Sequence, residues 1–121
     1  MVMGFESTFQ SRVLSYLNSL PGCKAENVSG NAMQSGRPDI TGCYWGRMFK
    51  LELKTPDNRY KASKKQNLEL RRWKNVGCVI GVIYSMDILY QLFSWDWDEH
   101  PGRIERVEAN NCLSWYEIPV W

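Results

Sequence analysis

Residues 38–54 (PDITGCYWGRMFKLELK) constrain the fold most, because apolar and polar side chains alternate along two runs that a Trp-Gly dipeptide separates. A period of two is typical of β-strands with one buried face. The segment is therefore predicted to be a hairpin whose two-residue turn is Trp45-Gly46, with Asp39 opposite Glu52. Trp-Gly is a weaker turn signal than Asn-Gly, and a longer loop would shift this pairing.

The predicted register pairs Tyr44 with Arg47 and Ile40 with Leu51. It gives the hairpin one apolar face, formed by Ile40, Tyr44, Phe49, Leu51 and Leu53. The opposite face is polar and holds Asp39, Thr41, Cys43, Met48, Lys50, Glu52 and Lys54. Because the two faces separate cleanly, the register is self-consistent.

The other elements follow from periodicity and from helix-end signals. Apolar residues at helical spacing predict a helix over residues 5–20, on an arc of Phe5, Phe9, Val13, Tyr16, Leu17 and Leu20. A capping box at Ser63 and Gln66 opens a second helix that ends at Gly77, with an inward stripe of Ala62, Leu70, Trp73 and Val76. Further predictions are a short strand and polar loop over residues 24–33, a buried strand over 78–84 and a helix over 85–93.

The predicted order is therefore α-β-β-β-α-β, an α/β fold with a mixed sheet flanked by helices. A length of 121 residues favours one domain, residues 1–121, with a core over about 5–85. Residues 94–121 are rich in Trp and acids, and their role is not predicted. Asp96, Asp98, Glu99 and His100 fit a solvated acidic loop better than a second metal site.

Several classes of protein are excluded. No apolar run approaches the ~18 residues that span a bilayer, and no secretory signal opens the chain. A single His100 cannot form a multi-histidine site. The cysteines lack a C-x-x-C pair and are expected to be free thiols in a reducing cytosol: Cys23, Cys43, Cys78 and Cys112.

Charge is distributed unevenly along the chain. Residues 37–74 carry eleven basic and four acidic side chains, a net charge of +7, whereas the rest carry four basic and nine acidic ones, a net charge of −5. Such asymmetry is typical of a face that binds a polyanion, although a lysine-rich exposed helix gives the same pattern. Besides Lys54, the basic residues are Arg37, Arg47, Lys50, Arg59, Lys61, Lys64, Lys65, Arg71, Arg72 and Lys74.

Two of the four acids in this basic segment oppose each other on the polar face of the hairpin. Asp39 and Glu52 would repel unless a cation lies between them, and Lys54 follows two residues after Glu52. Two carboxylates bind hard ions such as Mg²⁺ or Mn²⁺, and a lysine assists phosphodiester hydrolysis by stabilising charge. An ordinary Glu–Lys strand pair beside a surface Asp is the structural alternative.

Two further polar residues lie on predicted apolar helix faces. Glu6 falls inside the arc of the first helix, where it is a candidate metal ligand. A capping box at Ser7-x-x-Gln10 would instead leave Glu6 solvated. Gln66 falls inside the second stripe, where it either orients the water, lysine or phosphate, or simply caps its own helix at Ser63.

These residues together resemble the PD-(D/E)XK nucleases, and more narrowly the stand-alone VRR-NUC domains of phages and bacteria. The resemblance rests on Glu6, residues 35–40 (SGRPDI), residues 51–54 (LELK) and Gln66, and it covers about residues 5–85. It implies a restriction-endonuclease-like core and Mg²⁺- or Mn²⁺-dependent DNA cleavage in the cytoplasm, for recombination or repair. It also implies a central triad of Asp39, Glu52 and Lys54, with Glu6 and the Leu53 carbonyl as further metal ligands.

The leading hypothesis is a structure-specific endodeoxyribonuclease for Holliday or other branched DNA junctions, acting as a homodimer without a small-molecule cofactor. Two symmetric cuts need two sites, and a chain this short offers little surface beyond one. In that mechanism the ten basic residues other than Lys54 are candidate phosphate contacts. A nickase, flap nuclease or general DNA endonuclease of the same fold is the first alternative. A non-catalytic nucleic-acid-binding module is the second, although opposed acids would weaken its hold on phosphate.

Overall fold

A computed structural model describes residues 5–28, 37–56 and 63–121, except for the side chains of residues 5–7. Its described elements are α1 (Phe5–Ser19), β1 (Cys23–Asn27), β2 (Ile40–Tyr44), β3 (Arg47–Leu53), α2 (Lys64–Asn75), β4 (Val79–Ile83), α3 (Met86–Ser94), β5 (Gly102–Val107), a 3₁₀ turn (Ala109–Asn111) and β6 (Leu113–Ile118). The predicted α/β class and element order are therefore confirmed.

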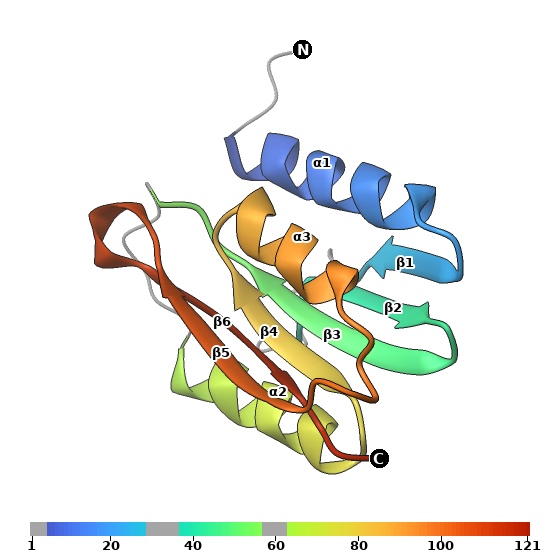
Figure 1. Cartoon of the computed structure of the whole chain (residues 1–121). Coiled ribbons are helices and arrows are strands. Elements are labelled where there is room, and N and C mark those ends of the chain that lie inside the picture. The colour runs from blue at the N-terminus through green and yellow to red at the C-terminus, as the bar shows by residue number, and fades with distance from the viewer. Residues whose placement is uncertain (1–4, 29–36, 57–62) are drawn as a thin grey trace.

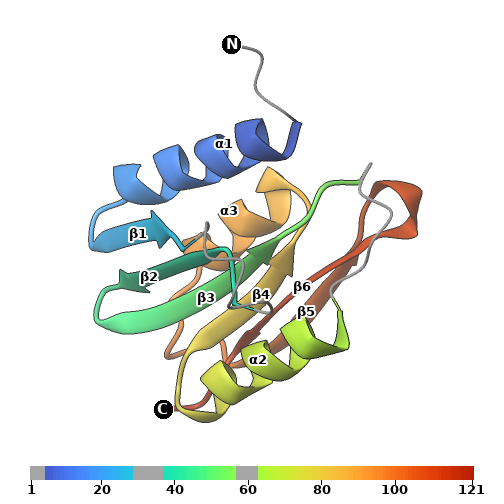
Figure 2. The same ribbon diagram turned by 180° about the vertical axis from the view of Figure 1, so that it is seen from behind.

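The described strands form one sheet in the order β1-β2-β3-β4-β6-β5. Only β3 and β4 run parallel, and α2 makes the crossover between them, while all other neighbours are antiparallel. Helices α1 and α3 cover one face of the sheet and α2 covers the other (Figures 1 and 2). The sheet is thus mixed and flanked by helices, as predicted.

The larger hydrophobic core lies between the sheet and the α1–α3 layer. Phe9, Val13 and Leu17 of α1 are buried there at the helical spacing that the sequence indicates. Phe49 of β3 is fully buried and packs edge-to-face on Phe93 of α3, with ring centroids 5.0 Å apart. The apolar face of the hairpin therefore faces this core, and its polar face lies on the α2 side.

Helix α2 begins and ends where its cap signals predict. Ser63 and Gln66 form the reciprocal capping box, and Gly77 follows the helix with a φ of +101°, a conformation that suits glycine. Leu70 is buried and Trp73 packs beside it, but the prediction for Val76 was wrong. Val76 is 75% exposed because it is the C-cap residue, where the helical wheel no longer holds. Ala62 lies outside the described residues.

The tail beyond α3 completes the sheet. Strand β6 pairs with β4, and residues 114–119 are buried, so β6 covers an edge that β4 would otherwise expose. Strand β5 pairs with β6 and is exposed along its whole length. The acidic residues before β5, including Asp96, Asp98 and Glu99, are exposed, as expected for a solvated loop.

No helix among the described residues is both long and apolar enough to cross a lipid bilayer. All four cysteines are free, as the sequence predicts. Burial, reinforced by the neighbouring Cys43, raises the pKa of the Cys23 thiol to about 11, so Cys23 is protonated at neutral pH.

Candidate active site

The β2–β3 hairpin has the predicted register. Tyr44 pairs with Arg47 and Ile40 pairs with Leu51. The two turn residues, Trp45 and Gly46, have φ values of +48° and +83°, as in a type I′ turn. The alternative of a longer, shifted loop is therefore wrong.

Asp39 lies where β2 begins, at the end of the hairpin opposite the turn. Its carboxylate Oδ2 accepts a hydrogen bond of 2.8 Å from the backbone N–H of Leu53. Its own carbonyl accepts from the N–H of Val28 at 2.8 Å, which ties Asp39 to the segment after β1. Because Leu53 directly follows Glu52, these bonds hold the two acids of the predicted triad at the same end of the hairpin.

Glu52 is 3% exposed and lies on the sheet face that α2 covers. Its Oε1 accepts a hydrogen bond of 3.1 Å from Nε2 of Gln66. The same Gln66 accepts from the backbone N–H of Ser63 through Oε1, at 2.9 Å. Gln66 therefore caps its own helix and also contacts Glu52, while its predicted role of orienting the water, lysine or phosphate stays a prediction.

Lys54 follows β3 at the point where the parallel strand β4 ends. Its backbone N–H donates to the carbonyl of Ile83 at 3.0 Å, which extends the β3–β4 pairing by one residue. The side chain is half-buried. Alternation along β3 puts Lys54 on the same face as Glu52, while Leu53 points into the core.

Three predicted site residues have side chains outside the described part of the chain. Glu6 lies in the first turn of α1, but its side chain is outside the described residues, as are Arg59 and Lys61. Within the described part of the chain, no three His, Cys, Asp or Glu side chains gather as a metal-binding group. The candidate donors are the Asp39 carboxylate, which accepts from the Leu53 N–H, the Glu52 carboxylate and the carbonyl of Leu53, the residue after Glu52. They fit Mg²⁺, which is commonly held by one or two carboxylates and completed by water.

A cavity of about 270 Å³ lies between the hairpin and α2, and its lining includes Pro38, the residue before Asp39, and the acid Glu69. Arg37, Lys50 and Trp73 are among the residues that line it. The Lys50 ammonium lies 3.9 Å from the centroid of the Trp73 ring. Burial lowers the pKa of Lys50, the nearby Cys78 opposes this change and Arg37 adds to it. Two of the predicted phosphate contacts, Arg37 and Lys50, therefore line one cavity.

The other predicted phosphate contacts in the described residues lie at the start of α2, further along α2, and at the turn end of the hairpin. Lys64 and Lys65 are exposed at the start of α2, next to Gln66. Further along α2, Arg71 and Lys74 surround Glu117 of β6 at 3.3 and 3.7 Å, and Arg72 lies 3.4 Å from Glu69. At the turn end of the hairpin, Arg47 pairs with Asp98 at 2.7 Å. These intramolecular partners reduce the positive charge that Arg47, Arg71, Arg72 and Lys74 offer to an anionic ligand.

Glu117 is a buried acid that the sequence analysis did not single out. Arg71, Lys74 and Arg103 all lie within ion-pair distance of its carboxylate. Burial raises the pKa of Glu117, but hydrogen bonds and charges from Arg103 and Arg71 outweigh burial and lower it overall. Glu117 is therefore ionised at neutral pH. Its only sequence signal is a lone acid among aromatic residues, which did not identify a strand partner for α2.

Comparison with known proteins adds no relative: no protein-family model, curated protein or solved structure matches this chain. The VRR-NUC resemblance therefore stays a prediction that rests on the residues quoted for it.

Proposed function

We propose that this chain is a Mg²⁺- or Mn²⁺-dependent endodeoxyribonuclease with branched DNA junctions as its favoured substrate. The observation that carries the proposal is the hydrogen bond from the Leu53 N–H to the Asp39 carboxylate. It places one acid directly beside the Glu52-x-Lys54 strand end, within the segment of net charge +7. A protein that only binds nucleic acid gains nothing from two acids at this position, because they repel phosphate.

Asp39, Glu52 and the Leu53 carbonyl would hold the metal ion. A Mg²⁺ ion held there would polarise the phosphate and lower the pKa of a bound water. Lys54 stabilises the negative charge that develops on the phosphate oxygens, and Gln66 positions Glu52 by hydrogen bonding. Arg37 and Lys50 hold the neighbouring phosphate from their shared cavity.

A cleavage assay on end-labelled four-way junction, flap and linear duplex DNA tests this function, in Mg²⁺, Mn²⁺ or EDTA. We expect metal-dependent paired cuts in opposing strands of the junction. Lys54→Met should slow cleavage by roughly 10²-fold or more, because a charge that stabilises the transition state is lost. Lys24→Met is the matched control, since Lys24 is exposed on β1, and it should cut at the wild-type rate.

Other results point elsewhere. Equal cutting of all three substrates would indicate a general DNA endonuclease. Metal-independent binding without cutting, unchanged in Lys54→Met, would support the non-catalytic module instead.

Replacing Gln66 by glutamate separates its two roles. A glutamate at this position still accepts from the Ser63 N–H, so α2 should keep its cap and its helical circular dichroism. It loses the N–H that Glu52 accepts and puts a second carboxylate there, which raises the pKa of the pair. We expect cleavage to fall about 10- to 100-fold at neutral pH and its pH profile to shift upward. An unchanged pH profile would show that Gln66 acts only as a cap.

We also propose that the enzyme is a homodimer joined along β5. All residues of β5 are exposed, and its pairing within the described sheet uses only the edge toward β6. Antiparallel pairing about Ile104 would set Arg103 of one copy opposite Glu105 of the other, so opposite charges would meet twice. Sedimentation velocity should give a dimer that Ile104→Lys converts to a monomer. A wild-type monomer at assay concentrations would contradict this arrangement.

A further inference from the structure

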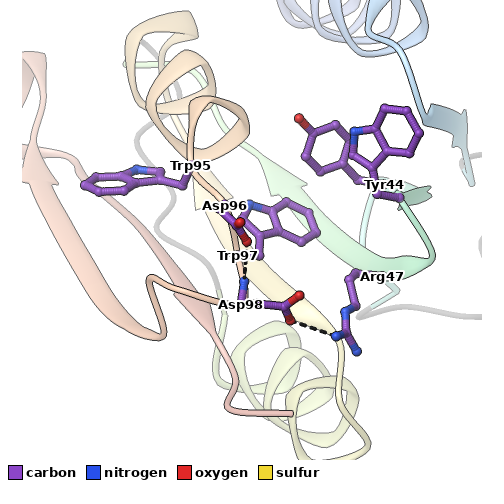
Figure 3. Close-up of a pocket in the computed structure, with 7 residues that line it drawn as sticks. Tyr44, Arg47, Trp95, Asp96, Trp97 and Asp98 are labelled. Atoms are coloured by element: carbon purple, nitrogen blue, oxygen red, sulfur yellow. Dashed lines mark hydrogen bonds and ion pairs between the residues drawn. The ribbon is translucent and has the colours of Figure 1, made fainter.

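A second cavity, of about 340 Å³, lies at the turn end of the hairpin, far from Asp39 and Glu52. Four aromatic residues line it: Tyr44, Trp45, Trp95 and Trp97. Figure 3 shows that Tyr44 comes from the hairpin, whereas Trp95 and Trp97 come from the segment that follows α3. We call this cavity the aromatic pocket. Its volume is within the range of small-ligand sites, about 300–1,000 Å³.

Tryptophan at position 45 costs conformational free energy. Its φ of +48° belongs to the left-handed region, which type I′ turns normally fill with Asn or Gly. One side of its indole lies on Gly22, where an added Cβ would come within 2.3 Å of the ring. The side chain is nevertheless 67% exposed. A ligand that covers the ring would offset the free-energy cost of the strained backbone and of the exposed apolar surface.

The floor of the aromatic pocket is rigid. Trp97 is 4% exposed and donates its indole N–H to the carbonyl of Leu92 at 2.8 Å. Tyr44 donates its hydroxyl to the carbonyl of Phe93 at 3.3 Å. Both rings are therefore held in place by α3, which reduces the entropy lost when a ligand binds.

The charged residues of the aromatic pocket determine which sign of charge the ligand carries. Arg47 forms an ion pair with Asp98 at 2.7 Å (Figure 3). The Arg47 guanidinium also lies 4.2 Å from the centroid of the Trp121 ring. Asp96 adds a second carboxylate, which also accepts from the N–H of Asp98 at 3.0 Å. The lining therefore has a net charge of −1. Aromatic faces and a negative charge together attract a cation and repel a phosphate.

We propose that the aromatic pocket binds a cationic side chain, arginine or lysine, from a basic segment of a partner protein. The cation would lie against the exposed face of Trp45 and close to Asp96. Arg47 and Glu52 are at opposite ends of β3, about 16 Å apart at the strand rise per residue. A partner docked here leaves the candidate active site open, and the proposal stands without the nuclease activity.

Proton–nitrogen correlation spectra of the full chain test the pocket, because each indole N–H gives its own signal. The probes are Nα-acetyl-arginine methylamide and the corresponding lysine compound, with deoxyadenosine monophosphate as the comparison. We expect saturable shifts of the Trp45 and Trp97 signals with both cations, weakened by salt, and none with the nucleotide.

Two variants remove one part of the pocket each. Trp45→Asn deletes the indole while improving the turn, so it should fold and bind the cations about tenfold more weakly. Asp96→Asn keeps the acceptor for the Asp98 N–H but loses the charge, and should also weaken binding severalfold. Asp87→Asn removes an exposed acid outside the pocket and should bind as the wild type does.

Three results would overturn the proposal. The first is the absence of saturable shifts with either cation. The second is cation binding that Trp45→Asn leaves unchanged. The third is tighter binding of the nucleotide than of the cations, which would make the pocket a base-stacking site for nucleic acid.

Discussion

Asp39→Asn should abolish metal-dependent DNA cleavage and leave the fold intact. The asparagine Oδ1 still accepts the hydrogen bond from the Leu53 N–H, so the end of the hairpin keeps its geometry. The negative charge that would bind the metal ion is lost. We expect cleavage to fall by roughly 10³-fold or more in the assay described above, because metal binding and transition-state stabilisation fail together. The melting temperature should stay within about 3 °C of the wild-type value.

Asp39→Ala is the informative partner of this variant. It loses both the charge and the acceptor, so it should also lose about 1 kcal/mol in the free energy of unfolding. If Asp39→Asn cleaves DNA like the wild type, Asp39 is only a structural acceptor for the Leu53 N–H and the proposed metal site is wrong.

Phe49→Ala should cause the largest loss of stability among these substitutions. Phe49 is fully buried, and its ring packs on Phe93 and Trp97 from the α3 side. The same ring lies across Gly42 on β2, where an added Cβ would come within 2.3 Å of it. Deleting the ring removes these contacts and leaves a cavity beneath α3. We expect a loss of about 3–5 kcal/mol in the free energy of unfolding, measured by urea denaturation.

Met48→Ala is the control for Phe49→Ala. Met48 precedes Phe49 on the same strand, but its side chain points away from the core and is 43% exposed. It should change the free energy of unfolding by less than about 0.5 kcal/mol. Equal losses from the two variants would contradict the assignment of the apolar face of β3 to the core.

The fold could be predicted from the sequence wherever local signals agree. In the hairpin, alternation fixes which face is buried, and a turn of two residues fixes the register that pairs Tyr44 with Arg47. In α2, Ser63 and Gly77 mark both ends by their own chemistry. These features depend on residues that are close together in the chain, so they can be predicted from the sequence alone.

The tail could not be predicted, because its partners are distant in the sequence. Strand β6 is buried against β4, from which it is separated by α3 and β5. Strand β5 is exposed along its whole length, so no buried alternation marks it as a strand. The prediction for Val76 failed for a more local reason, because a helical wheel does not show at which residue the helix ends.

The candidate site was predicted in part for a related reason. The hairpin register predicts that Asp39 and Glu52 meet, and the hydrogen bond of Asp39 to the Leu53 N–H agrees with this arrangement. The helical face pattern places Gln66 on the inward stripe of α2, but it does not predict the hydrogen bond to Glu52. The ion-pair partners of Arg47, Arg71 and Lys74 were not predicted, because Asp98 and Glu117 belong to the tail. The pairing of charges across a sheet depends on topology that the local sequence does not contain.

The position of β6 between β4 and β5 also determines when folding can be completed during synthesis. Until residues 113–118 have left the ribosome, β4 has an unpaired edge and the segment that becomes β5 has no strand to pair with. The hairpin, α2 and β4 can be in place earlier, but the nascent chain then exposes the backbone of a fully apolar strand. Folding is therefore expected to finish after translation of β6, and slow synthesis between β4 and β6 should favour aggregation.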